Sequence, residues 1–257
     1  MPRLADKAAV ITGGAGGIGI ETARLFLREG AKVALVDLDQ GALDEAANAL
    51  EGDGKVVALT ADVSKEEDVR NYVKQARDRL GRIDIFFNNA GIEGAAGPIT
   101  RQKIEDFDKV MAVNVRGAFL GLKYVLQVME EQASGGSIVN MSSVAGLTGS
   151  PDLAPYIISK HAVLGMTRAA ALEVAAKGIR VNSVHPAPIN TRMMRSIESG
   201  MDADHAEDVR KAYAKAIPMQ RYGEAAEVAQ VVLFLASDDA SYVTGAHYTV
   251  DGGMTPN

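Results

Sequence analysis

Tyr156 and Lys160 lie four residues apart in Y-I-I-S-K, at the start of a stretch whose apolar residues recur every three or four positions. That period is typical of a helix, and a spacing of four places the phenol and the ammonium group on one helical face. A phenol has a reference pKa near ~10, and a neighbouring cation lowers it. The pair predicts a general acid and base, although the motif alone is weak because both residues are common on helix surfaces.

Five glycines lie between Gly13 and Gly19 in T-G-G-A-G-G-I-G, after a predicted strand and directly before a predicted helix. Such a loop lets the backbone approach a pyrophosphate, whose charge is favoured by the free amide groups at the helix start. The residues fit G-x-G-x-x-G in the register Gly14, Gly16 and Gly19. A flexible turn is the alternative for a lone glycine motif.

Asp37 ends the second predicted strand, eighteen residues after Gly19. A carboxylate in this place accepts hydrogen bonds from the adenosine ribose hydroxyls and repels a 2′-phosphate. Because no Arg or Lys lies in the glycine loop or directly after Asp37, the sequence favours NAD over NADP as the cofactor.

Polar residues also end the third and fourth predicted strands. Asp62-Val63 follows the third, and Asn88-Asn89-Ala90-Gly91 follows the fourth. Asp62 has the alternative of capping the helix that starts near Ser64, and the second segment has the alternative of an ordinary turn. Together with the glycine loop, these positions favour a dinucleotide site that includes Asp62, Val63, Asn89, Ala90 and Gly91.

Short β-branched runs alternate with longer helical patterns along the chain. The predicted strands are 8–12, 32–37, 56–60, 83–88, 137–141, 179–184 and 247–250, and the predicted helices are 17–29, 41–50, 65–80, 104–132, 155–176 and 225–236. This alternation of mostly apolar strands with helices predicts an α/β fold. We expect a single doubly wound Rossmann-type domain over residues 1–257, with a seven-stranded parallel sheet and helices on both faces.

Residues 190–218 break this alternation. The segment mixes charged residues with Met and lacks a strand pattern. Long connections in compact domains are usually functional lids or disordered. We therefore predict a mobile, partly helical flap that covers the substrate.

The composition excludes several classes of function. The formal net charge is −6, there is no Cys, and the four His are not clustered with carboxylates at ligand spacing. The sequence therefore predicts no nucleic-acid partner and no metal site. A chain without cysteine fits a reducing compartment, and neither a signal peptide nor a membrane span is predicted, so we expect a cytoplasmic protein.

Ser143 follows the fifth predicted strand, thirteen residues before Tyr156, and Asn114 lies inside a predicted helix. With these residues the chain resembles the short-chain dehydrogenase/reductase family over nearly its whole length. The matching motifs run from T-G-x-x-x-G-I-G at Thr12 to V-D-G-G at Val250. The resemblance implies glycine positions Gly13, Gly17 and Gly19, with Ile18 between the last two, in place of the register counted above.

The resemblance also implies the catalytic roles. Tyr156 would donate or accept the proton, and Lys160 would lower its pKa and bind the nicotinamide ribose. Ser143 would hold the substrate oxygen, and Asn114 would organise a water in the proton path. An Asn inside a helix has the alternative of bonding to nearby backbone. Ser142, beside Ser143, is expected to be structural.

One segment departs from the family pattern, which usually has Pro-Gly after the sixth strand. This chain has His185-Pro186-Ala187-Pro188, and Ala narrows the accessible backbone angles. By resemblance, Pro186, Ile189 and Thr191 are expected to contact the cofactor, the last two at its carboxamide and phosphate. The path of this loop stays open.

The substrate implied by the resemblance is a small secondary alcohol or ketone, loosely like the cyclic ones on which some family members act. Its expected pocket lies over the nicotinamide and is lined by Glu93, Ser143, Leu147, Leu153, His185, Arg192 and Met193. Arg192 has the alternative of being solvated.

Family members are commonly homotetramers, so the resemblance implies a homotetramer here. The leading interpretation of function is an NAD-dependent alcohol dehydrogenase or carbonyl reductase. Two alternatives are a nucleotide-sensing regulatory protein without turnover and an enoyl reductase or epimerase on the same fold. A complete set of Ser143, Tyr156 and Lys160 argues against the sensor, because sensing needs no proton relay.

Overall fold

The computed structural model describes residues 2–255, and within them seven parallel strands form one sheet. The spatial order is β3-β2-β1-β4-β5-β6-β7. The strands are β1 (Ala8–Thr12), β2 (Lys32–Asp37), β3 (Val56–Thr60), β4 (Ile85–Asn88), β5 (Gly136–Met141), β6 (Ile179–Pro186) and β7 (His247–Val250). The predicted seven-stranded parallel sheet is confirmed.

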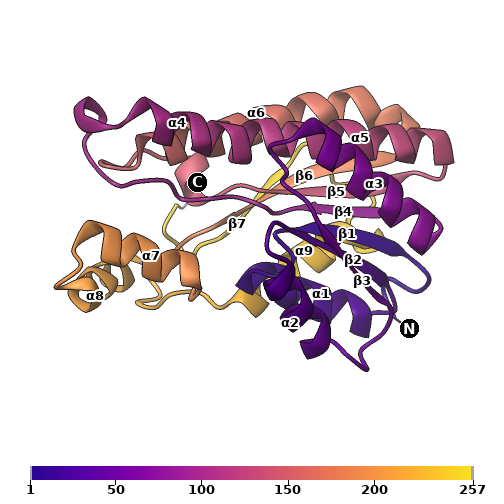
Figure 1. Cartoon of the computed structure of the whole chain (residues 1–257), viewed down its shortest axis with the longest axis horizontal. Helices are drawn as coiled ribbons and strands as arrows, with labels where there is room; N and C mark the ends of the chain where they lie inside the picture. The colour runs from indigo at the N-terminus through magenta and orange to yellow at the C-terminus, as the bar shows by residue number, and fades with distance from the viewer. Residues whose placement is uncertain (1, 256–257) are drawn as a thin grey trace.

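Helices cover both faces of the sheet (Figure 1). One layer holds α3 (Glu66–Leu80), α5 (Ala118–Gln132) and α6 (Ala154–Val174), and the other holds α1 (Gly17–Arg28), α2 (Gln40–Ala49) and α9 (Ala225–Ala236). The remaining helices are α4 (Ile104–Val110), α7 (Arg192–Met201) and α8 (Ala206–Ala216). Among the residues that the structure describes, no helix is both long and apolar enough to cross a membrane.

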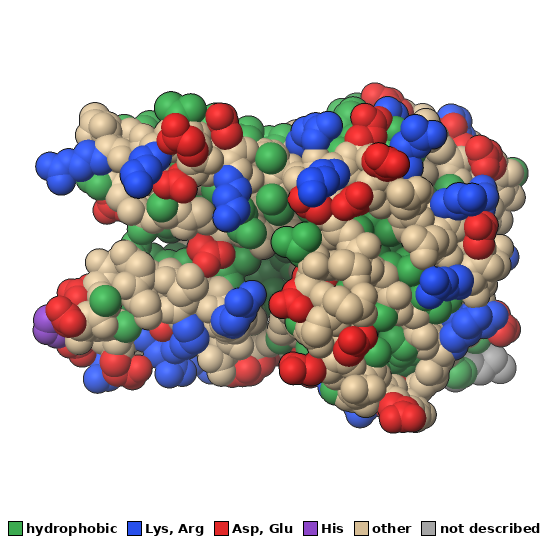
Figure 2. All heavy atoms as spheres, viewed as in Figure 1, with side chains coloured by type: hydrophobic (Ala, Val, Ile, Leu, Met, Phe, Trp, Pro, Cys, Tyr) green, Lys and Arg blue, Asp and Glu red, His purple; other side chains and the backbone are tan. Residues whose placement is uncertain are grey.

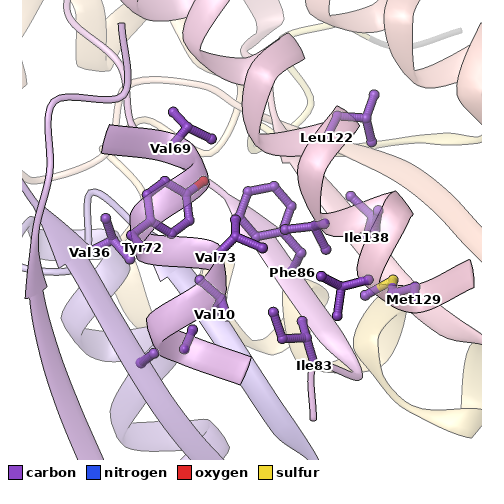
Figure 3. Packing of buried hydrophobic residues seen from close by; sticks show 14 of the residues in the cluster. Val10, Val36, Val69, Tyr72, Val73, Ile83, Phe86, Leu122, Met129 and Ile138 are labelled. Atoms are coloured by element: carbon purple, nitrogen blue, oxygen red, sulfur yellow. The ribbon is translucent and has the colours of Figure 1, made fainter. Parts of the chain in front are cut away.

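The core consists of two apolar layers, one on each face of the sheet. Alternate residues of each strand point to opposite layers, so that Val10 packs under α3 and α5 while Ile11 packs against α1 and α9. Figure 3 shows the first layer, in which Phe86 of β4 lies among side chains of α3 and α5. Burial on both faces explains why most strand residues are apolar.

The strand order reverses at β1, which pairs with β2 on one side and β4 on the other. Ligands of doubly wound sheets bind at such a switch point, beyond the carboxyl ends of the strands. Three helical segments are followed by glycines with positive φ, because Gly30, Gly81 and Gly178 have φ of 89°, 90° and 72°.

Several predicted elements differ in extent by one or more residues, among them β4, β6 and the predicted helix 104–132. β4 starts at Ile85, not at residue 83, and the Asp84 carboxylate just before it accepts a hydrogen bond from Ala8 N at 2.9 Å. β6 continues to Pro186, beyond the predicted end at residue 184, because it stays paired with β7 up to Val250. The predicted helix 104–132 is divided by a π-helical segment, Met111–Gly117, between α4 and α5.

The predicted flap contains α7 and α8, so its partly helical character is confirmed. Its two ends are joined, because Asn190 N donates to Gly223 O at 2.8 Å and Gly223 N donates to Pro188 O at 3.0 Å. Figure 2 shows the molecule hollowed between this α7–α8 segment and the part that contains α4. The segment that contains α7 and α8 therefore begins and ends at neighbouring points of the backbone, near Asn190 and Gly223.

Candidate active site

Tyr156 and Lys160 occupy the first turns of α6, where the fold brings that helix against the end of β5. Lys160 Nζ lies 5.4 Å from the centroid of the Tyr156 ring and donates to the carbonyl oxygen of Met141 at 3.1 Å. The Lys160 side chain is buried and the Tyr156 ring is half-buried. The amine is thus fixed between the phenol and the sheet.

The pKa values of this pair differ from the expectation. Burial raises the pKa of Tyr156 to about 12, the hydrogen bond with the Ser143 hydroxyl acts to lower it, and the Glu93 carboxylate acts to raise it. Burial also lowers the pKa of Lys160 to about 8. In this structure the pKa of the phenol is raised, because removal of its hydroxyl from water outweighs the hydrogen bond with Ser143; the expected effect of Lys160 on that pKa stays a prediction.

The two adjacent serines at the end of β5 have different surroundings. Ser143 Oγ accepts from Ala145 N at 3.1 Å and lies 3.4 Å from the carbonyl oxygen of Pro186, to which it donates. Ser142 is buried, and its Oγ donates to the carbonyl oxygen of Lys160 at 2.9 Å. Ser142 therefore fastens α6 to β5, in agreement with its expected structural role, and Ser143 is the serine beside the phenol.

Asn114 lies in the π-helical segment, and both N–H groups of its side chain and one acceptor site of its Oδ1 are bonded. Its Oδ1 accepts from Ile92 N at 2.8 Å, while its Nδ2 donates to Ile92 O at 2.8 Å and to Ser159 Oγ at 3.0 Å. The side chain thus joins the loop after β4 to α6, one residue before Lys160. These partners are remote in the sequence, so the side chain does not make the local backbone bond of the alternative, and its expected role in the proton path stays a prediction.

The glycine loop is shaped for close approach of the backbone. A Cβ on Gly19 would overlap the carbonyl oxygen of Gly13, and one on Gly17 would lie 3.3 Å from Thr191 Cγ2. Gly16 caps α1 without any side-chain acceptor, and the first turn of the helix carries no acidic residue. The amide groups at the start of α1 therefore fit an anion such as a pyrophosphate.

Asp37 stands at the expected place beside this loop and is half-buried. Its carboxylate accepts from Ala15 N at 3.1 Å and from Leu38 N at 2.8 Å, which fixes its position. A carboxylate has about four acceptor sites, so two are left for ribose hydroxyls. The geometry fits the adenosine end of a dinucleotide.

The loops after β3 and β4 meet the same edge of the sheet. Asp62 Oδ1 accepts from Ser64 N at 3.0 Å and from Ser64 Oγ at 2.7 Å, which closes the turn before α3; the helix itself has Lys65 as its N-cap and no side-chain cap. Asn89 Nδ2 donates to Thr12 O at 2.9 Å and thereby holds the glycine loop. A Cβ on Gly91 would lie 3.4 Å from Lys160 Nζ, so that this loop links the two halves of the site. Neighbouring half-buried residues are Ile18, Val63 and Ala90.

The residues expected after β6 lie between the sheet and the flap. Pro186 and Ile189 are buried, and Thr191 Oγ1 donates to Ile189 O at 3.3 Å. Since Thr191 also lies against Gly17, the start of the flap reaches the glycine loop. The altered sequence around Ala187 keeps this connection.

The expected substrate residues have different exposures. Glu93, Leu147, Leu153 and Met193 are half-buried, and Arg192 is exposed, as its solvated alternative requires. His185 is fully buried. The expectation that His185 lines the substrate pocket is wrong, because β6 extends past it and takes its side chain into the sheet layer.

No role for Thr12 was predicted from the sequence, nor were the buried contacts of Glu198 with Tyr222 and Arg195. Thr12 Oγ1 accepts from the backbone N–H groups of Asn89 and Ala90 at 3.0 and 3.1 Å. Glu198 of α7 is 3% exposed, accepts from Tyr222 Oη at 2.8 Å and pairs with Arg195 at 3.0 Å. The spacing of three between Arg195 and Glu198 was the available signal for this pair.

Comparisons with known proteins agree with this site and fold. The family model described as enoyl-(acyl carrier protein) reductase matches residues 13–255. Levodione reductase of Leifsonia aquatica is 42% identical over 98% of this chain and 96% of its own length. Cyclohexanol dehydrogenase of Acinetobacter sp. (strain SE19) is 40% identical over 97% of this chain and 95% of its own length.

Solved structures extend the likeness to three dimensions. The crystal structure of levodione reductase superposes with a TM-score of 0.95 and covers 98% of both chains. The structure of NAD+-bound xylitol dehydrogenase is 34% identical and superposes with a TM-score of 0.92. The match covers 98% of this chain and 100% of that chain. The predicted fold class and the predicted resemblance are confirmed.

Proposed function

The chain belongs to the short-chain dehydrogenase/reductase family, and on that premise we propose that it is an NAD-dependent oxidoreductase that interconverts a secondary alcohol and a ketone. The observation that carries the proposal is the meeting of Tyr156, Lys160 and Ser143 beside the loop after β4, which bonds to the glycine loop. The proposed proton-transfer group, Tyr156, and the proposed dinucleotide-binding glycine loop therefore lie at the same edge of the sheet.

The residues present fit a nicotinamide dinucleotide. The start of α1 would hold the pyrophosphate, Asp37 the adenosine ribose, Lys160 the nicotinamide ribose, and Ile189 with Thr191 the nicotinamide end. Asp62, Val63, Asn89, Ala90, Gly91 and Pro186 complete the proposed set. NAD supplies the hydride chemistry, and the chain supplies orientation and the proton. NADP is disfavoured by the charge of Asp37.

Tyr156 is the proposed proton donor and acceptor. In ketone reduction the neutral phenol gives its proton to the substrate oxygen, and Ser143 donates a hydrogen bond to the same oxygen. Since the pKa of Tyr156 is about 12 in this structure, the protonated phenol dominates at neutral pH and is ready for reduction. Alcohol oxidation needs the phenolate, which the positive charge of Lys160 would stabilise.

The proposed substrate is a small cyclic secondary alcohol or its ketone. Two of the relatives support this class by name, levodione reductase and cyclohexanol dehydrogenase. The half-buried Leu147, Leu153 and Met193 supply apolar surface for a ring, and Glu93 supplies a polar group near the phenol. A carboxylate there disfavours anionic substrates.

Enoyl reduction is the second candidate, because it is the description of the matched family model. The relatives named above include dehydrogenases of alcohols, and the hydroxyl of Ser143 beside the phenol suits a carbonyl or hydroxyl oxygen. An assay of saturated ketones beside enones separates the two reactions.

The direct test is an assay of cyclic and acyclic secondary alcohols with NAD, and of the matching ketones and enones with NADH. The change in NADH absorbance measures turnover in both directions. We expect turnover with at least one alcohol and its ketone, and none with the enones. Turnover of enones alone, or of no compound in the panel, contradicts the proposal. Tyr156→Phe, assayed in parallel, reports background oxidation.

We also propose a cytoplasmic homotetramer. Large apolar side chains remain exposed on the outer helices, with Phe119 of α5 at 54% and Leu172 of α6 at 86%. Such surfaces mark association sites when they are contiguous. The absence of cysteine from the sequence supports a reducing compartment. Light scattering of the purified protein at several concentrations measures the assembly, and a monomeric mass contradicts it.

A further inference from the structure

His185 of β6 makes two directed hydrogen bonds while fully buried. Its Nδ1 lies 2.9 Å from the carbonyl oxygen of Ser143, and its Nε2 lies 2.8 Å from Ser183 Oγ. A carbonyl oxygen only accepts, so Nδ1 must carry the proton, and in the neutral ring Nε2 then accepts from the serine hydroxyl. The surroundings select one tautomer of His185.

The regular ladder between β5 and β6 ends at this place. Ser142 N donates to Val184 O, and the alternation of the parallel ladder places the next donor at the backbone nitrogen of Pro186. Proline has no N–H, so the pairing of β5 with β6 stops there. Ser143 therefore lies beyond the last bond of the ladder, and the imidazole of His185 donates to its backbone.

Ser143 is held to β6 at two points. His185 binds its carbonyl group, and the carbonyl oxygen of Pro186 accepts from its hydroxyl at 3.4 Å. The ring of His247 on β7 packs edge-on against His185 with 5.6 Å between ring centroids. The imidazole is thus fixed from both sides, and a rotation of the Ser143 backbone would move its hydroxyl away from Tyr156.

His185 stays neutral over the ordinary pH range. Burial lowers its pKa to about 4, the bond to Ser143 acts to raise it, and the charges of His247, Lys160 and Arg168 act to lower it. The ring is therefore neutral, with its proton on Nδ1, at neutral pH.

We propose that His185 is a positioning residue, whose Nδ1–H sets the orientation of Ser143 toward the substrate oxygen. The inference rests on the proposed function, because it assigns Ser143 a role in the reaction. His185 itself touches neither substrate nor cofactor.

The first test compares His185→Ala with His185→Asn, because the amide N–H of Asn occupies nearly the place of Nδ1–H. We expect His185→Ala to lower kcat by about 100-fold, the effect of misplacing a reacting group by roughly 1 Å, with KM and the NADH dissociation constant changed less than about twofold. His185→Asn should recover kcat to within about tenfold of wild type. His205→Ala, at an exposed histidine, is the control for expression and assay.

An unchanged kcat in His185→Ala overturns the inference, and so does an equal loss in both variants. The second test needs no turnover: the imidazole ¹⁵N resonances of His185 in the wild-type protein report its tautomer. We expect a proton on Nδ1 from about pH 6 to 8, and a proton on Nε2 overturns the inference. If the wild type turns over no substrate while the Nδ1–H tautomer is observed, the proposed function fails and the hold on the Ser143 backbone stands.

Discussion

Lys160 Nζ lies 5.4 Å from the centre of the Tyr156 ring and is bonded to the carbonyl oxygen of Met141. The amine therefore stands beside the phenol and is also part of the packing between α6 and β5. Burial shifts both pKa values toward the neutral forms, to about 8 for the amine and about 12 for the phenol. Burial of the charged form of Lys160 therefore lowers the free energy of unfolding, and this effect is separate from any role of the pair in catalysis.

Lys160→Met tests this effect. Because the pKa of Lys160 is lowered from 10.5 to about 8, the unfolded chain binds more protons than the folded one between these values. Wild-type stability therefore rises with pH across this window and falls as pH drops through about 8. We expect the variant to lose that rise and to be more stable than wild type near neutral pH, by ~1 to 3 kcal/mol after the loss of the Met141 bond.

Urea unfolding of both proteins at about pH 7 and pH 10 measures the effect. The Lys160→Met variant should also lose turnover. A pH dependence equal to that of wild type would show that Lys160 is not desolvated as described.

The adjacent serines give a matched pair of variants. Ser143→Ala should lower kcat by roughly 10²- to 10³-fold with little change in stability, because in the proposed reaction its hydroxyl donates to the substrate oxygen. Ser142→Ala should destabilise the fold by about 0.5 to 1.5 kcal/mol, since it removes a buried hydrogen bond between β5 and α6. Steady-state kinetics and thermal unfolding of both variants measure the two effects. A loss of stability in Ser143→Ala together with a loss of kcat alone in Ser142→Ala would contradict the proposed site.

Much of the fold follows from local patterns. Residues 33–36 of β2 form a continuous apolar run that is buried on both faces, and the bounds of β2 coincide with the prediction. The end of β6 was mispredicted because Pro186 is a poor strand residue, and its inclusion depends on pairing with β7, which is remote in sequence. The π-helical segment around Asn114 likewise depends on its bonds to Ile92 and Ser159.

The site was predictable in its residue types and less so in its electrostatics. The spacing of Tyr156 and Lys160 indicates which groups meet. Their pKa values depend on how deeply the sheet and α6 bury them, and no spacing in the sequence contains that information. His185 shows the same limit, because its burial follows from the extra length of β6.

Asp37 gives the prediction for cofactor choice. We expect NADH to bind at least about tenfold more tightly than NADPH, because the carboxylate repels a 2′-phosphate. Asp37→Asn removes the charge, keeps the side-chain shape and should narrow the difference. Isothermal titration of both cofactors with both proteins is the measurement, and equal affinities in wild type would refute the ribose argument.

The central claim is that Tyr156 transfers the proton in a hydride-transfer reaction. Turnover of the best secondary alcohol by wild type and by Tyr156→Phe, together with the NADH affinity of each, tests it most directly. We predict that the variant loses at least about 10³-fold in kcat while its NADH dissociation constant stays within about twofold of wild type. Wild-type turnover in Tyr156→Phe would contradict the claim.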